Sequence, residues 1–77
     1  MQIYYAPAFL RLFKKLDPPV KEGVKTTVSK VIDLCETGNR SVGLGIKNLR
    51  GDLWEARSNL RIRVVYSMGK DEIRFLL

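Results

Sequence analysis

With 77 residues, the chain is long enough for one domain around a small hydrophobic core. Hydrophobic residues make up 45% of it and charged residues 29%, ordinary values for a globular protein that exclude wholesale disorder. Fourteen Lys and Arg against eight Asp and Glu give a net charge of +6, which favours an anionic partner such as a nucleic acid or an acidic protein.

Cysteine and histidine usage excludes several kinds of site. Cys35 is the single cysteine, so no disulfide can form within the chain, and we expect an intracellular, cytoplasmic protein. Because the sequence has no histidine and no cysteine pair, we expect neither a metal ion nor another cofactor. The first residues do not follow the pattern of a signal peptide, and no apolar run approaches the ~18 residues of a membrane span.

The chain begins with a predicted strand and a predicted helix. Residues 2–5 (QIYY) are rich in β-forming side chains and predict a short strand. Pro7 suits the first turn of a helix. Apolar residues then recur at the spacing of one helical face, namely Phe9, Leu12, Phe13 and Leu16.

A second helix is predicted directly after the first. Asp17 can cap it, Pro18 can occupy its first turn, and Gly38 can end it. Its apolar stripe comprises Val20, Val24, Val28, Val31 and Cys35, so Cys35 is expected to be a small core residue rather than a nucleophile. With about two residues between them, the two helices should form an antiparallel hairpin.

After a loop over residues 39–45, the apolar period changes from helical to two. Strands are expected near 45–49, 53–58, 61–67 and 72–77, and the connections are short enough to require an antiparallel meander. The tripeptide Arg50-Gly51-Asp52 is expected to be a turn rather than an adhesion motif. The predicted fold class is α+β, a two-helix hairpin packed on one face of an antiparallel sheet.

Side-chain alternation sorts the strand residues onto two faces. The even positions Trp54, Ala56, Ile62, Val64 and Tyr66 are apolar and should face the helices. A three-residue loop over 58–60 would place Arg57 opposite Arg61, and a Gly69-Lys70 turn would place Val65 opposite Arg74. The other face should therefore gather Arg57, Arg61, Arg63, Arg74, Glu55 and Glu72, with Lys47 or Arg50 near the rim.

Such an arginine-rich face has two interpretations. Like charges directly opposite each other destabilise a sheet, and arginine is well suited to forked contacts with phosphate, which together favour an anion-binding site. The alternative is a solvated sheet surface on which Glu55 and Glu72 partly neutralise the arginines.

The element order and the stretch NLRGDLWEARSNLRIRVVYS resemble the RelE/ParE superfamily of bacterial toxins, most closely its HigB-like, phage-associated branch. The resemblance covers essentially the whole chain and implies a RelE-like fold of order β-α-α-β-β-β(-β). It implies the toxin component of a type II toxin–antitoxin system, with a cognate antitoxin protein as partner. Many members are mRNA interferases that cut messenger RNA in the ribosomal decoding site, whereas the ParE branch poisons DNA gyrase.

The resemblance also implies roles for individual residues. Arg57 matches a basic residue that these endoribonucleases place against the scissile phosphate, and Arg63 matches the active-site arginine of the R-x-V-Y strand. Glu55 is the one obvious general base, at a position where some members carry lysine. The expected contacts to the RNA backbone come from Lys47, Arg50, Arg61 and Arg74.

The chain departs from the family pattern at its C-terminus. Relatives usually continue past the last strand with a basic or His-bearing segment and a closing helix, whereas this sequence stops at Phe75-Leu76-Leu77. We therefore expect one domain over residues 1–77 that lacks this segment, with homo-oligomerisation through its last strand. Three functions stay open: a ribosome-dependent mRNA endoribonuclease that inhibits translation, a gyrase-directed toxin, and a non-catalytic or degenerate module that binds nucleic acid or antitoxin.

Overall fold

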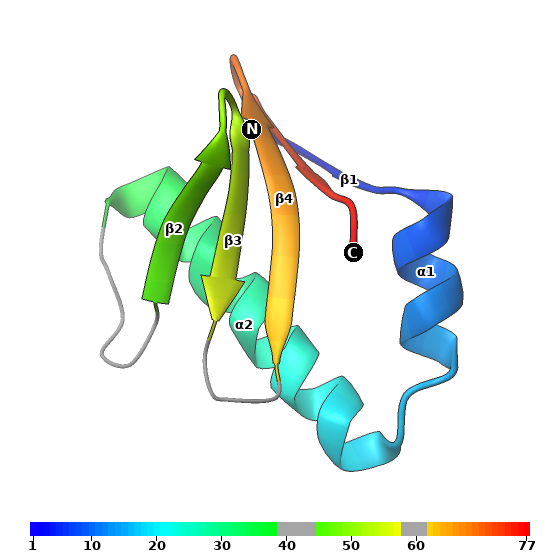
Figure 1. The fold of residues 1–77 in the computed structure, drawn as a ribbon. Coiled ribbons are helices and arrows are strands. Elements are labelled where there is room, and N and C mark those ends of the chain that lie inside the picture. Colours follow the sequence, from blue (N-terminus) through cyan, green and yellow to red (C-terminus); the bar gives the residue numbers. More distant parts are fainter. Residues whose placement is uncertain (39–44, 58–61) are drawn as a thin grey trace.

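The computed structural model describes residues 1–38, 45–57 and 62–77, and it shows two helices packed on a five-stranded mixed sheet (Figure 1). The predicted α+β class and element order are confirmed. The elements in chain order are β1 (Gln2–Tyr5), α1 (Pro7–Lys14), α2 (Pro18–Thr37), β2 (Gly45–Arg50), β3 (Leu53–Arg57), β4 (Arg63–Gly69) and β5 (Glu72–Phe75). None of the helices in the described ranges is long and apolar enough to span a bilayer.

The ends of α2 follow the predicted signals with one exception. Pro18 lies in the first turn, and Gly38 ends the helix in the left-handed region at φ 78°, where its N–H donates to the Leu34 carbonyl at 2.8 Å. Asp17 occupies the N-cap position, but its side chain makes no capping hydrogen bond. Asp17 therefore begins the helix by its extended backbone rather than by its carboxylate.

The two helices do not form the expected close hairpin. Figure 1 shows α2 crossing behind the strands, whereas α1 runs beside the sheet and diverges from α2. The aromatic ring of Phe9 explains this position, because it packs 5.7 Å from the ring of Tyr5 and 6.0 Å from that of Phe75. Leu12 was expected to join the apolar stripe, but it is 49% exposed, because it lines an open apolar hollow together with Phe13 and Leu16.

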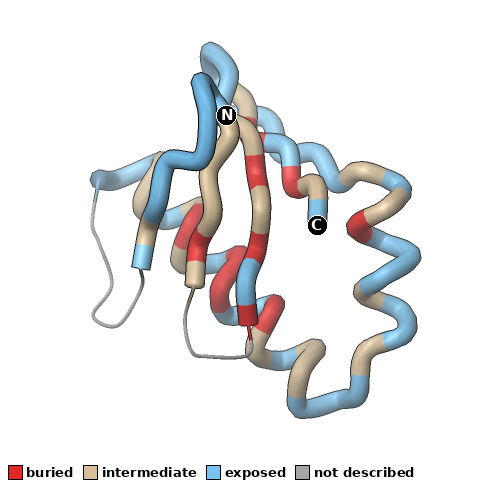
Figure 2. Tube along the Cα trace, in the orientation of Figure 1, coloured by how far each residue is buried: buried red, intermediate tan, exposed pale blue. Residues whose placement is uncertain are grey.

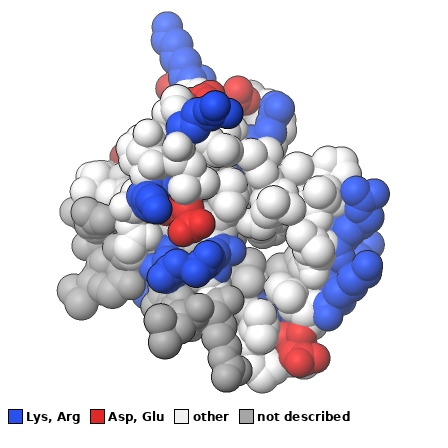
Figure 3. Space-filling view, in the orientation of Figure 1, with Lys and Arg blue, Asp and Glu red and all other residues white. Residues whose placement is uncertain are grey.

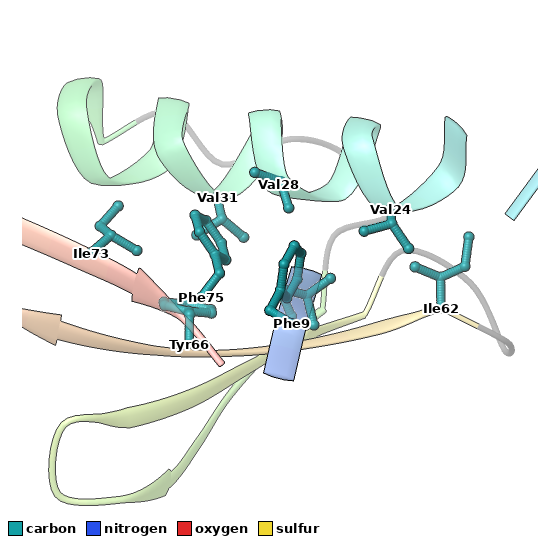
Figure 4. Close-up of a cluster of buried hydrophobic side chains, with 10 residues drawn as sticks. Phe9, Val24, Val28, Val31, Ile62, Tyr66, Ile73 and Phe75 are labelled. Atoms are coloured by element: carbon teal, nitrogen blue, oxygen red, sulfur yellow. The ribbon is translucent and has the colours of Figure 1, made fainter. Parts of the chain in front are cut away.

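The core fills the space between α2 and the sheet. Figure 2 shows buried residues along β4 and along the side of α2 that faces it, and Figure 4 shows Val24, Val28 and Val31 pointing from α2 toward the strands. Burial of this apolar surface is the main stabilising contribution. The buried hydrophobic residues are Phe9, Val24, Val28, Val31, Ala56, Ile62, Val64, Tyr66, Ile73 and Phe75.

The sheet has the strand order β1-β5-β4-β3-β2. Strands β2 to β5 form the predicted antiparallel meander, but β1 pairs parallel with β5, so the sheet is mixed rather than antiparallel. The last strand was expected to have an open side. It instead lies between β1 and β4, so both of its edges are already paired. β5 therefore offers no free edge for the predicted oligomerisation.

Both hairpins after β3 differ in register from the prediction. Arg57 pairs with Arg63 rather than Arg61, so the connection is longer than three residues. Lys70 and Asp71 form the next turn in place of Gly69-Lys70, with Asp71 taking the positive φ of 62°, so Ser67 rather than Val65 faces Arg74. In each case the pairing moves by an even number of residues, so the side chains of the described strand residues keep their predicted faces.

Candidate nucleic-acid interface

The sheet face turned away from α2 carries a compact charged group. Across the strands, Arg57 stands opposite Arg63, and in the next row Lys47 stands opposite Glu55. We call Lys47, Glu55, Arg57 and Arg63 the basic cluster. Figure 3 shows Lys and Arg atoms on both sides of an acidic group over the strands, and a separate basic group over α1.

The geometry of the basic cluster follows from strand alternation. Ala56 and Val64 point into the core, so their neighbours Glu55, Arg57 and Arg63 must point outward. Glu55 and Arg57 are half-buried, and Arg63 and Lys47 are exposed. The inner face therefore fixes the backbone of the strands while the outer side chains stay accessible.

The pairing of Arg57 with Arg63 brings two like charges close together. Residues directly opposite each other in an antiparallel pair have Cβ atoms roughly 5 Å apart, so the Arg57–Arg63 pairing is locally unfavourable. Across the described ranges, the single ion pair joins Lys25 Nζ to a Glu22 carboxylate oxygen at 3.5 Å on α2. Glu55 thus forms no ion pair with either arginine, and both guanidinium groups can accept an anion such as phosphate.

Two of the predicted site residues, Arg74 and Arg50, lie away from the basic cluster, and a third is not described. Arg74 is on the same face, but it aligns with Ser67, which lies four residues along β4 from Arg63, a separation of ~13 Å along the strand. Arg50 pairs with Leu53 beside the Gly51–Asp52 turn, which has the predicted turn structure. Arg61 lies outside the described residues.

Tyr4 is a surface residue that the sequence did not single out. It pairs with Arg74 across β1 and β5, and the Arg74 guanidinium carbon lies 5.3 Å from the centre of its ring. The Tyr4 hydroxyl also donates a hydrogen bond to Oε1 of Gln2. Alternation within QIYY places Tyr4 and Gln2 on one face of a strand. The sequence does not show which face this is, because that depends on the parallel pairing of β1 with β5 at the other end of the chain.

Glu72, the second acidic residue predicted for this face, also lies apart from the basic cluster. It pairs with Gly69 on β4 and with Gln2 on β1, at the end of the sheet beside the Lys70–Asp71 turn. It is therefore too far along the strands to neutralise Arg57 or Arg63, and Glu55 is the only carboxylate in the basic cluster.

Cys35 lies on the opposite side of the sheet from the basic cluster. Its Sγ is 3.9 Å from Sδ of Met68, and the residue is half-buried at the edge of the core. Burial raises the pKa of the Cys35 thiol, and the neighbouring Glu36 carboxylate adds to this effect. A protonated thiol is a poor nucleophile, which agrees with the interpretation of Cys35 as a packing residue.

In the described ranges, the chemistry of the basic cluster consists of fixed positive charge and one carboxylate. No group of three or more His, Cys, Asp or Glu side chains that could hold a metal ion occurs in the part of the chain that the structure describes. No protein-family model matches the chain, and no curated protein matches it at a significant level. Evidence for a function therefore comes from the sheet face and from the sequence pattern that it carries.

Proposed function

We propose that the chain is the toxin component of a type II toxin–antitoxin pair, a HigB-like member of the RelE/ParE superfamily with a RelE-like fold. Its activity would be cleavage of messenger RNA on the ribosome, which inhibits translation. The observation that carries this proposal is the pairing of Arg57 with Arg63 on the outer face of β3 and β4, with neither arginine in an ion pair within the described part of the chain. Such a pair is locally costly and suits a phosphate.

The proposed reaction is attack of a ribose 2′-hydroxyl on the adjacent phosphorus. The bond from the 2′-oxygen to phosphorus forms, the bond from phosphorus to the 5′-oxygen breaks, and the products are a cyclic phosphate and a 5′-hydroxyl. Arg57 and Arg63 stay protonated, so they stabilise the negative charge of the phosphorane rather than transfer a proton. Glu55, one row away, accepts the 2′-hydroxyl proton, and the leaving oxygen takes a proton from solvent.

The partners follow from the same charge distribution. Messenger RNA held in the ribosome would be positioned largely by the ribosome itself. The main contribution of the protein would then be positive charge beside the scissile phosphate. Lys47 extends the basic cluster toward β2, and Arg50 and Arg74 lie farther out on the sheet, where they would contact the RNA backbone. An acidic antitoxin segment laid over this face would compete with the RNA.

The test is a purified translation reaction in which primer extension maps cuts in the message. The wild-type protein should give cleaved message at fixed codon positions, and Arg57→Ala or Arg63→Ala should lower cleavage by about 10²–10³-fold. Arg11→Ala, on the exposed surface of α1, is the matched control and should cleave normally. Circular dichroism of each variant should remain that of the wild type.

Two other functions give different results in the same set of assays. A gyrase-directed toxin would leave the message whole and induce DNA breaks with purified gyrase. A non-catalytic module would bind RNA with a steep loss of affinity as salt rises, without cutting it. The non-catalytic module is favoured by one observation, namely that Arg57 and Arg63, which would hold the phosphate, cannot transfer a proton.

A further inference from the structure

The two edge strands of the sheet, β2 and β1, differ in whether they can pair with a further strand. The β2 edge carries Lys47 and Arg50, and its register shifts between Asn48 and Arg50. The Asn48 side-chain amide donates to the carbonyls of Gly51 at 3.0 Å and Leu53 at 3.2 Å. Charges and register irregularities are the features by which edge strands block further pairing, so this edge is protected.

The β1 edge has none of these protections. Gln2, Ile3, Tyr4 and Tyr5 are all exposed, and the strand contains no charged residue and no proline. The N–H groups of Gln2 and Ala6 donate to carbonyls of Asp71 and Phe75 beside β5, at 2.9 and 2.8 Å. Because backbone groups alternate along a strand, the N–H and C=O groups of Ile3 and Tyr5 point to the open side.

We propose that β1 is the interface of a homodimer, in which two copies pair their β1 strands antiparallel about a two-fold axis. Directly opposite residues of antiparallel strands share a face, and hydrogen bonds form between residues whose backbone groups point outward. Both conditions hold when Tyr4 stands opposite the partner's Tyr4, and Ile3 exchanges hydrogen bonds with the partner's Tyr5. The two sheets then become one continuous sheet.

The surface next to β1 also favours a partner strand. Ile3 and Tyr5 lie on the same side of the sheet as the core, yet they remain 36% and 43% exposed. Leu10 of α1 is 46% exposed, and it lines an apolar hollow of about 440 Å³ together with Tyr5. A second β1 strand would cover Ile3 and Tyr5 with the same two apolar side chains.

Charge favours a second copy over an acidic partner at this edge. The chain carries a net charge of +6, but β1 itself is uncharged, so it is an element through which two copies can meet without placing cations in contact. Arg74, the cation that β5 places opposite Tyr4, is packed on the Tyr4 ring. In the proposed register the two β5 strands lie three strand spacings apart, ~14 Å, which exceeds the Debye length of roughly 8 Å at physiological salt.

The test is sedimentation equilibrium of untagged protein over a dilution series. The wild type should show a concentration-dependent dimer, and Tyr4→Lys or Tyr4→Glu alone should halve the mass, because each places like charges opposite each other on the two-fold axis. An equimolar mixture of the two variants should restore the dimer. Thr26→Lys and Thr26→Glu, which change the charge equally on the exposed side of α2, should leave the wild-type dimer intact.

Amide hydrogen exchange gives a second readout of the same interface. Protection of the Ile3 and Tyr5 amides should rise with protein concentration, while the Gln2 and Tyr4 amides, which face β5, should change little. A wild type that stays monomeric at every concentration would overturn the proposal. So would a dimer that persists in both Tyr4 variants, or variants that do not dimerise when they are mixed. None of these measurements depends on an RNA-cleaving activity.

Discussion

The two faces of the sheet are built from the same strands under opposite constraints. On the inner face, Val64, Tyr66, Ile73 and Phe75 are at most 1% exposed and pack against α2 or α1. On the outer face, the basic cluster is open to solvent and places two arginines in direct opposition. Changes on the inner face should therefore alter stability, whereas changes on the outer face should alter the binding of anions.

The largest effect is expected from Phe75→Ala. The Phe75 ring is fully buried and lies within 6.0 Å of the rings of Tyr5, Phe9 and Tyr66. Its removal leaves a cavity, and the free energy of unfolding should fall by about 3–5 kcal/mol in urea titrations. Tyr4→Ala, which removes a ring from the outer face of the neighbouring strand, is the control; an equal loss in both variants would contradict the contrast between the faces.

Gly23→Ala tests how tightly α2 approaches the chain before β4. A Cβ at Gly23 would overlap Cδ1 of Ile62, which is buried. Replacing glycine inside a helix gains up to about 1 kcal/mol, but overpacking costs about 1–3 kcal/mol, so a net loss of about 1 kcal/mol is expected. Adding Ile62→Val removes the overlapping methyl, and the double variant should be more stable than Gly23→Ala alone.

On the outer face, Arg63→Gln should leave stability nearly unchanged. It removes the like-charge opposition with Arg57, so the free energy of unfolding should shift by no more than about 0.5 kcal/mol. Binding of single-stranded RNA should weaken, and the slope of log affinity against log salt should fall by about 0.7. A salt slope equal to that of the wild type would remove Arg63 from the interface.

The faces of the strands could be predicted, because alternation is a local property of the chain. The apolar residues Ala56, Val64 and Tyr66 lie inside as expected, and Arg57 and Arg63 lie outside. Register could not be predicted as well, because apolar alternation is satisfied equally by pairings that differ by two residues. Turn chemistry was also ambiguous, since Gly69 offered a positive φ and Asp71 is the residue that adopts it.

Contacts between distant parts of the chain were the main features that sequence patterns missed. The parallel pairing of β1 with β5 depends on surfaces that exist only after the meander has formed, and no short motif encodes it. This pairing places Tyr4 on the face that carries the basic cluster, buries β5 in the sheet interior, and leaves β1 as an unprotected edge. It also draws Phe9, and α1 with it, toward β5 rather than along α2.

The smallest effect is expected from Cys35, which lies at the edge of the core on the inner side of the sheet. Burial raises the pKa of the Cys35 thiol, so the folded chain holds this proton more tightly than the unfolded chain. The resulting stabilisation is complete below the ordinary thiol pKa of roughly 8.5 and is lost as pH rises through the raised value. Urea titrations of the wild type and Cys35→Ala should therefore show a difference in unfolding free energy that is constant at neutral pH and shrinks at alkaline pH. A difference that stays constant throughout would mean that the thiol ionises as readily in the folded chain as in the unfolded one.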